Sequence, residues 1–242
     1  MKEIAQVLYG SQNYGLSTLK SDKDYKVIMV PEFADLYSYH KVEKNDLPKE
    51  YNSEHYSVMS VMRFHELLMN GNPNCLEMLF SVEWDNRITD FQQYVGMARS
   101  LFKAGYLAVV WDSFYSALKG ITLNGMQRNG INNKSVSRAY YFYGMLAKLK
   151  DSNFKMNEKT WRGDTSYDRK AKNIRAGQFG SAGIQGVAES VYTAFNTDDT
   201  MKDAAALFCE NSPEMVKGFK NVVKTLDKLV KRIVWNVAME GM

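Results

Sequence analysis

A Gly-Ser pair followed by two alternate aspartates constrains this chain more than any other feature. Residues 8–31 read LYGSQNYGLSTLKSDKDYKVIMVP, with Gly10 and Ser11 near the start and Asp22 and Asp24 in front of an apolar run. Side chains of a strand alternate between its two faces, so the two aspartates are predicted to project on the same side. Neighbouring carboxylates repel each other unless a cation lies between them.

These residues predict phosphate ligands and metal ligands on one short stretch. Mg²⁺ takes oxygen ligands and commonly joins one or two carboxylates to substrate phosphates. Gly10 allows the backbone to approach a ligand closely, and Ser11 offers a hydroxyl and an N–H to a phosphate oxygen. The leading hypothesis is a nucleotide-handling site. The alternative is a surface hairpin with Gly15 in its turn and solvated aspartates.

Length and composition describe an ordinary globular chain. Its 242 residues can bury a sizeable core, and 45% apolar with 24% charged residues are typical of such proteins. No apolar run approaches the length of a membrane span, and the N-terminus lacks a signal-peptide pattern. Cys75 and Cys209 lie far apart without metal-ligand spacing, which favours reduced thiols. We therefore expect a cytoplasmic protein without membrane contact.

The net charge of +4 is unevenly distributed along the chain. Residues 1–100 carry 10 Lys/Arg and 14 Asp/Glu, whereas residues 101–242 carry 21 and 13. A basic half beside an acidic metal site suits a polyanion such as a nucleotide or nucleic acid. The alternative is a set of solvated helix faces.

Hydrophobic periodicity predicts an α+β chain. Strands are expected over 4–8, 24–30 and 75–80, a helix over 56–69, and an extended loop over 32–54. From residue 91 the pattern is helical, with helices expected over 91–104, 108–123, 140–149, 187–195 and 214–238 and a loop over 124–133. We expect a core with a small mixed sheet over 1–96 and a mostly helical domain over 97–242.

Glu77 is the acid of the apolar run CLEMLF. A carboxylate inside a buried strand is costly unless a charged group meets it, which makes Glu77 a candidate third metal ligand. The alternative is an edge-strand acid paired to Arg63. Glu83 and Asp85, just beyond the run, are the substitutes.

The Gly-Ser pair, the aspartates about ten residues later and the flanking apolar runs resemble the nucleotidyltransferase fold of the DNA polymerase β superfamily. GSQNYGL, SDKD and VIMVP are similar to its branch of RlaP-like predicted nucleotidyltransferases from bacteria and phages. Asn72-Pro73-Asn74 and Leu76-Glu77 look like the element that carries the third carboxylate in that family. The resemblance covers roughly residues 4–85.

The resemblance implies an Mg²⁺-dependent nucleotidyltransferase that moves an NMP from an NTP to an unidentified acceptor and releases pyrophosphate. Two Mg²⁺ ions, or Mn²⁺ in their place, are then expected on Asp22, Asp24 and Glu77, with general base as the other role for Glu77. Gly10 and Ser11 are expected to position the phosphates. If the gene is from a phage, the protein works in the host cytoplasm.

The stretch KSVSRAYYF resembles a Lys-then-Arg helix of the same branch, which implies that Lys134 and Arg138 bind the nucleotide. Val136 and Ser137 stand where many relatives have a His, so the role of that His is open here. Two solvated cations at a helix start are the alternative.

Two other functions stay open. The basic half favours an RNA or tRNA end as acceptor, and a non-catalytic nucleotide-binding module is the other alternative. A second basic stretch, interleaved with Trp161 and Tyr167, either grips single-stranded nucleic acid or forms a solvated rim. It comprises Arg162, Arg169, Lys170, Lys172 and Arg175.

Overall fold

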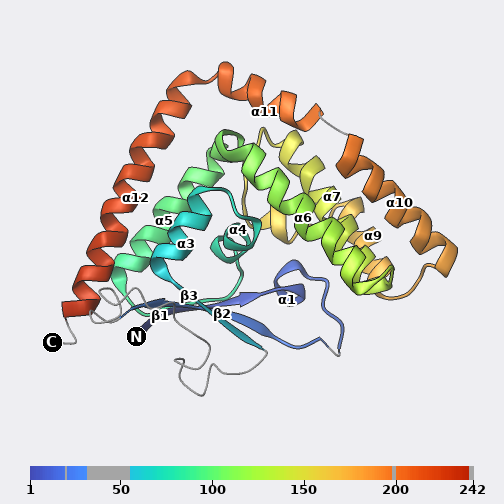
Figure 1. The fold of residues 1–242 in the computed structure, drawn as a ribbon, viewed down its shortest axis with the longest axis horizontal. Helices are drawn as coiled ribbons and strands as arrows, with labels where there is room; N and C mark the ends of the chain where they lie inside the picture. The colour runs from blue at the N-terminus through green and yellow to red at the C-terminus, as the bar shows by residue number, and fades with distance from the viewer. Residues whose placement is uncertain (20, 32–54, 198–199, 240–242) are drawn as a thin grey trace.

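The computed structural model describes residues 1–19, 21–31, 55–197 and 200–239 and is an α+β protein. The predicted loop 32–54 lies outside the described residues. A four-stranded sheet of order β3-β2-β1-β4 lies at one end of the molecule, with helices stacked on one side of it (Figure 1). Its strands are β1 (Lys2–Tyr9), β2 (Asp24–Val30), β3 (Tyr56–Ser60) and β4 (Trp84–Asn86).

Strand pairing makes the sheet mixed, as predicted, and positions the Gly-Ser pair. β1 runs antiparallel to β2 and β4, whereas β2 and β3 are parallel. Tyr9 pairs with Asp24, so the end of β1 lies beside the start of β2. Gly10, which follows β1, is therefore held next to Asp24.

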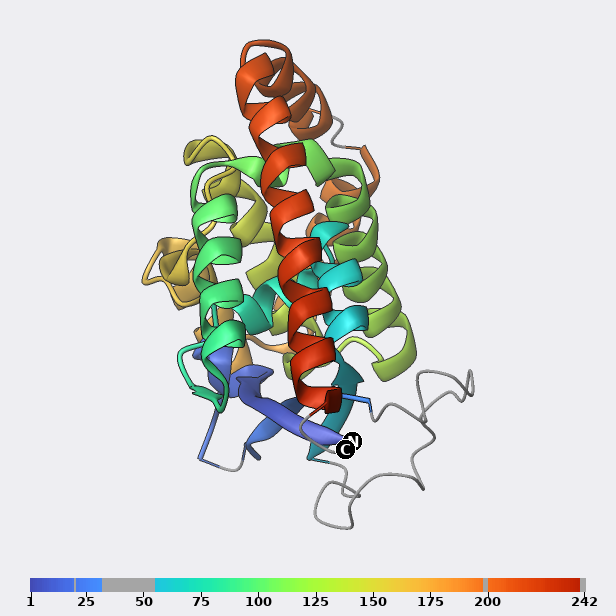
Figure 2. The same cartoon turned by 90° about the vertical axis from the view of Figure 1, so that its left-hand side faces the viewer.

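The helices form a layer above the sheet and an extension to one side of it (Figure 1, Figure 2). Near the sheet lie α1 (Ser11–Tyr14), α3 (Val61–Met69), α4 (Pro73–Leu79) and α5 (Thr89–Lys103). The 3₁₀ helix η3 (Tyr106–Val110) leads into α6 (Trp111–Asn129) and α7 (Asn133–Asp151). The others are α8 (Glu158–Trp161), α9 (Ser166–Arg175), α10 (Ser181–Thr197), α11 (Thr200–Glu210) and α12 (Pro213–Met239).

The predicted strand over 75–80 is wrong, because this segment is the helix α4. Asn72 caps the helix: its side chain accepts hydrogen bonds from the N–H groups of Asn74 and Cys75. Pro73 occupies the first turn, where its missing N–H costs nothing. Asn-Pro-Asn is thus the start of a helix that includes most of the apolar run.

The predicted helix over 56–69 is half correct. Its first five residues form β3, and Ser60 then caps α3 by accepting a hydrogen bond from the Arg63 N–H. Pairing with β2 outweighs helical periodicity in the first part. His65 on α3 contacts the Tyr94 hydroxyl at 2.9 Å and Asp227 Oδ1 at 2.6 Å.

The helical half contains the predicted helices, with different ends, together with α8, α9 and α11, which the sequence analysis did not predict. α6 continues to Asn129, into the predicted loop over 124–133. α7 begins earlier than predicted, because Asn132 caps it in a reciprocal arrangement with Ser135. α12 begins at Pro213, in agreement with the predicted start of the last helix.

Buried apolar side chains from both halves form one continuous cluster. The predicted boundary at residues 96–97 falls inside α5. Tyr14 joins the halves: its ring lies 5.0 Å from Tyr141, 5.7 Å from Phe142 and 6.0 Å from Trp161, measured between ring centroids. Among the described residues, none of the helices combines the length and apolar character that crossing a bilayer requires.

Close packing of α7 on α9 leads to a first prediction. A Cβ at Gly144 would lie 2.3 Å from the Cβ of Tyr167, far below contact distance. We expect Gly144→Ala to lower the free energy of unfolding by about 1–3 kcal/mol, because the helices must separate. Gly186→Ala is the control, since a Cβ there meets nothing within 4 Å. Equal urea midpoints for the two variants would contradict the prediction.

Candidate functional site

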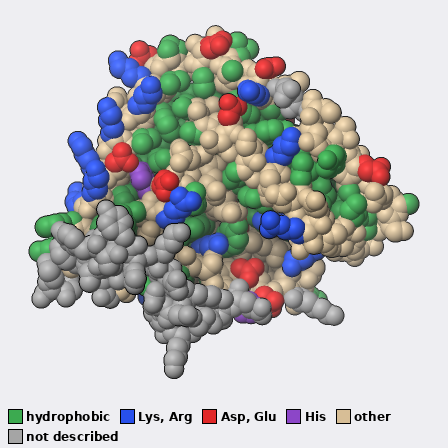
Figure 3. Space-filling model, in the orientation of Figure 1, with side chains coloured by type: hydrophobic (Ala, Val, Ile, Leu, Met, Phe, Trp, Pro, Cys, Tyr) green, Lys and Arg blue, Asp and Glu red, His purple; other side chains and the backbone are tan. Residues whose placement is uncertain are grey.

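A pocket of about 210 Å³ lies where the end of β1 and α1 meet α7 and α9. It collects polar and charged side chains from segments that are more than 100 residues apart in sequence. It is lined by Tyr9, Gly10, Ser11, Tyr14, Leu16, Asp24, Lys134, Ser137, Arg138 and Arg175. In the space-filling view, Lys and Arg side chains lie on this part of the surface, with acidic side chains nearby (Figure 3).

The structure brings five of the seven predicted site residues into this lining. They are Gly10, Ser11, Asp24, Lys134 and Arg138. The other two do not line it: Asp22 is exposed before β2, and Glu77 is fully buried on α4. The resemblance of KSVSRAYYF to a Lys-then-Arg helix placed residues 134 and 138 at this site, whereas the helical periodicity around residue 138 gives no indication that α7 packs beside the Gly-Ser turn.

Gly10 has a backbone conformation that essentially requires glycine, with φ 81° and ψ −148°. Its N–H donates a hydrogen bond to Glu77 Oε1 at 2.6 Å. A Cβ at this position would lie 3.1 Å from Asp24 Oδ2. Asp24 and Glu77 therefore approach Gly10 from different elements, and the missing side chain keeps the pocket open.

The carboxylate of Glu77 stabilises the Gly-Ser turn by accepting hydrogen bonds from it. Oε1 accepts the Gly10 N–H, and Oε2 accepts the Tyr14 hydroxyl at 2.5 Å. The side-chain amide of Asn13 lies 3.4 Å from Oε1. Arg63, the partner considered for Glu77, pairs with Glu66 instead. Burial raises the pKa of Glu77 to about 7, against the lowering effect of the bonds from Tyr14 and Gly10.

The raised pKa of Glu77 predicts a pH-dependent stability. Between its ordinary value of 4.5 and about 7, the folded state holds a proton that the unfolded state has released. The free energy of unfolding should therefore fall as the pH rises through this window, by at most about 3 kcal/mol. Glu77→Gln should flatten the curve there, as measured by urea unfolding at several pH values. An unchanged slope in that variant would contradict the assignment.

Arg138 is positioned by the aromatic cluster around Tyr14. Its guanidinium carbon lies 5.3 Å from the centre of the Phe142 ring, one turn further along α7. Arg138 is exposed by accessible surface, and partial desolvation by the neighbouring side chains acts to lower its pKa; Tyr14, Tyr9 and Glu77 outweigh this effect and hold the pKa above its ordinary value. Arg138 therefore keeps a positive charge in the lining of the pocket.

Arg175 is the charged residue of the pocket lining that the sequence did not assign to the nucleotide site. It belongs to the second basic stretch, and only the packing of α9 against α7 brings it beside Lys134 and Arg138. In the described part of the chain, none of these three cations forms an ion pair with a carboxylate. Three such cations around one small pocket favour an anionic ligand.

The acids fit a metal ion only in part. Over residues 1–19, 21–31, 55–197 and 200–239, no three His, Cys, Asp or Glu side chains are grouped to hold a metal. Asp24 lines the pocket with half of its side chain exposed, which suits a carboxylate that shares Mg²⁺ with ligand phosphates. Both carboxylate oxygens of Glu77 already accept hydrogen bonds. Its role as a metal ligand or general base stays a prediction.

The substitutes for Glu77 have other partners. Glu83 accepts a hydrogen bond from the Tyr25 hydroxyl, and Asp85 pairs with Arg87.

Comparisons of the chain with protein-family models, curated proteins and solved structures found no match.

Proposed function

We propose that the pocket binds the phosphates of a nucleoside triphosphate and that the protein is a Mg²⁺-dependent nucleotidyltransferase. In this reaction an NMP passes to an acceptor and pyrophosphate is released. One observation carries the proposal: residues 10, 11 and 24 of the Gly-Ser segment line the same pocket as residues 134 and 138, which the family resemblance implied as nucleotide ligands. A surface hairpin with solvated aspartates does not account for that convergence.

Each lining residue has a chemical task in this proposal. Lys134, Arg138 and Arg175 bind phosphate oxygens, with the planar guanidinium groups suited to paired hydrogen bonds. The open backbone at Gly10 lets a phosphate approach, and the Ser11 hydroxyl orients it. Fixed positive charge beside the reacting phosphate stabilises the negative charge that develops in the transition state.

A bound Mg²⁺ ion would supply further charge neutralisation at the phosphates. Asp24 would hold it from the pocket wall, with Asp22 two residues earlier as the second candidate ligand. Glu77 holds the Gly10 N–H and the Tyr14 hydroxyl in place, which keeps the turn in its open form.

Pyrophosphate release from each of the four NTPs, with Mg²⁺ and cell extract as acceptor source, tests the proposal. Arg138→Ala should raise the KM for the NTP at least tenfold, because a charge-assisted hydrogen bond to phosphate is lost. Arg128→Ala removes an exposed arginine at the end of α6 and serves as the control. Unchanged kinetics in the Arg138 variant would refute the assignment of the pocket.

A nucleotide-binding module without catalysis is the second candidate. It is favoured by the buried carboxylate of Glu77, whose hydrogen bonds leave Asp24 as the acid in the pocket lining. Such a module would show Mg²⁺-NTP binding by calorimetry but no pyrophosphate release with any extract. Transfer with labelled NTP would exclude it.

We propose the cytoplasm as the working compartment. Cys75 and Cys209 are both free thiols, which fits a reducing environment. RNA remains the alternative acceptor that the basic half favours.

A further inference from the structure

We infer that Arg162 and Lys172 form a second phosphate-binding subsite outside the pocket, for a phosphate of a second ligand. If the proposed function holds, that ligand is the acceptor. Both side chains lie against Gly15, in the turn after α1: a Cβ there would lie 3.7 Å from Arg162 Nε and 4.0 Å from Lys172 Cε. Two cations from different elements thus meet over one residue.

Packing, rather than attraction between the two side chains, imposes this arrangement. Trp161, next to Arg162, is buried and stacks on Tyr14 with an interplanar angle of 19°. The Tyr141 hydroxyl donates a hydrogen bond to the Trp161 carbonyl oxygen. On α9, the Ala171 carbonyl accepts a bond of 2.8 Å from the buried Ser137 hydroxyl. Each cation therefore extends from a fixed backbone.

Among the residues that the structure describes, no carboxylate neutralises either cation. Arg162 and Lys172 are both exposed, and within the described ranges no carboxylate lies in ion-pair distance of them. Like charges brought together favour an anion between them. Exposed lysines and arginines usually stand apart or face acids, as Arg169 faces Asp164 here.

The subsite continues the cationic wall of the pocket. Lys172 and Arg175 are three residues apart on α9 and so lie on the same face, about 5–6 Å apart at Cβ. Arg175 lines the pocket, and Lys172 stands at Gly15. The pocket of about 210 Å³ is smaller than the roughly 300–1,000 Å³ usual for ligand sites, so a second ligand must lie outside it.

Binding of a fluorescent single-stranded decanucleotide, measured by anisotropy at several salt concentrations, tests the subsite. The double variant Arg162→Gln/Lys172→Gln should bind at least tenfold more weakly. Its plot of log K against log salt should be less steep by about 1.4, because each phosphate contact of a single strand contributes about 0.7. Binding of Mg²⁺-NTP should change less than twofold.

Two further variants control for fold and for total charge. Arg162→Lys/Lys172→Arg keeps both charges and should keep oligonucleotide binding. Lys217→Gln/Lys220→Gln removes two exposed charges from α12, on the other side of the molecule from α9, and should leave the binding unchanged (Figure 1).

The outcomes separate the subsite from the proposed function. Unchanged oligonucleotide affinity in the glutamine variant overturns the subsite, as does an equal loss of NTP binding, which would assign the cations to the nucleotide. Oligonucleotide binding without NTP binding in the unmodified protein keeps the subsite and refutes the proposed function. Competition by ribose 5-phosphate supports a small phosphorylated ligand, and competition by unlabelled oligonucleotide alone supports a nucleic-acid backbone.

Discussion

Asp24→Asn is expected to reduce nucleotidyl transfer at least about a thousandfold, which corresponds to about 4 kcal/mol of transition-state stabilisation. Asp24 is the acid of the pocket lining, so in the proposed function its loss removes the carboxylate that would face the phosphates. The melting temperature should stay nearly constant, because the side chain is half exposed and its neighbour His55 is 3.9 Å away. Pyrophosphate release and thermal unfolding measure the two effects.

Two other substitutions show whether the effect belongs to the pocket. Asp22→Asn should cause a smaller loss than Asp24→Asn, because Asp22 does not line the pocket. Asp151→Asn removes an exposed carboxylate at the end of α7 and should leave transfer unchanged. Full activity of Asp24→Asn would refute the proposed function, and equal losses at 22 and 24 would restore the predicted two-aspartate metal site.

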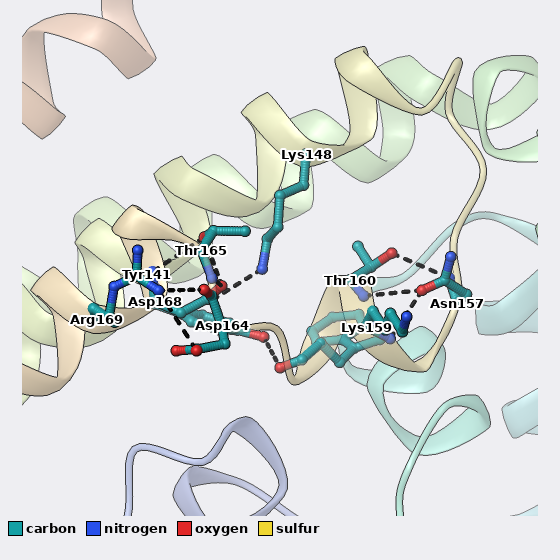
Figure 4. Close-up of polar contacts among 10 residues, drawn as sticks. Tyr141, Lys148, Asn157, Lys159, Thr160, Asp164, Thr165, Asp168 and Arg169 are labelled. Atoms are coloured by element: carbon teal, nitrogen blue, oxygen red, sulfur yellow. Dashed lines mark hydrogen bonds and ion pairs between the residues drawn. The ribbon is translucent and has the colours of Figure 1, made fainter.

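Asp168→Ala is expected to lower the free energy of unfolding by about 3–5 kcal/mol, the cost of leaving one buried charge without its partner. Lys148 on α7 points to Asp168 on α9 in Figure 4 and meets Oδ1 at 2.9 Å. Thr165 donates its N–H and hydroxyl to Oδ2 at 2.9 and 2.6 Å. Only 4% of the Asp168 side chain and 14% of the Lys148 side chain are exposed.

The neighbouring surface pair provides a matched control. Asp164 and Arg169 lie 3.5 Å apart in the same segment, with side chains 79% and 60% exposed (Figure 4). Asp164→Ala should therefore cost less than about 1 kcal/mol. Urea unfolding of Asp164→Ala and Asp168→Ala compares the two pairs. Adding Lys148→Met and Lys148→Met/Asp168→Ala completes a double-mutant cycle, which gives the coupling free energy between Lys148 and Asp168. Similar midpoints for Asp164→Ala and Asp168→Ala would contradict the buried-pair argument.

The Asp168 pair also predicts loss of stability in acid. Burial acts to raise the pKa of Asp168, but the bonds from Thr165 and Lys148 outweigh it and lower that pKa below its ordinary 3.8. Its stabilisation is complete above that value and is lost as the pH falls through the lower, folded-state value. Asp168→Ala should remove this component from the acid unfolding curve. Asp168 thus makes the free energy of unfolding fall as the pH falls, whereas Glu77 makes it fall as the pH rises.

Local sequence predicted β1, β2 and the long helices α5, α6, α7, α10 and α12, because each carries its own signal, but it did not predict β3, β4, α8, α9 or α11. β1, β2 and the long helices follow from short apolar runs and from 3.6-residue periodicity. α4 was missed because a six-residue apolar run fits a strand or a helix equally. The cap by Asn72 and the position of Pro73 decided the outcome.

The sequence by itself determined the α+β class, with a small mixed sheet and a helical second half, and singled out the Gly-Ser turn, Asp24, Lys134 and Arg138. Only the tertiary structure decided that these residues share a pocket, that Arg175 joins them and that Glu77 lies under the turn. Secondary-structure signals act over a few residues, whereas the pocket depends on Tyr14 packing against α7 and on α7 packing against α9. Contacts between segments more than 100 residues apart leave no spacing in the sequence from which to predict them.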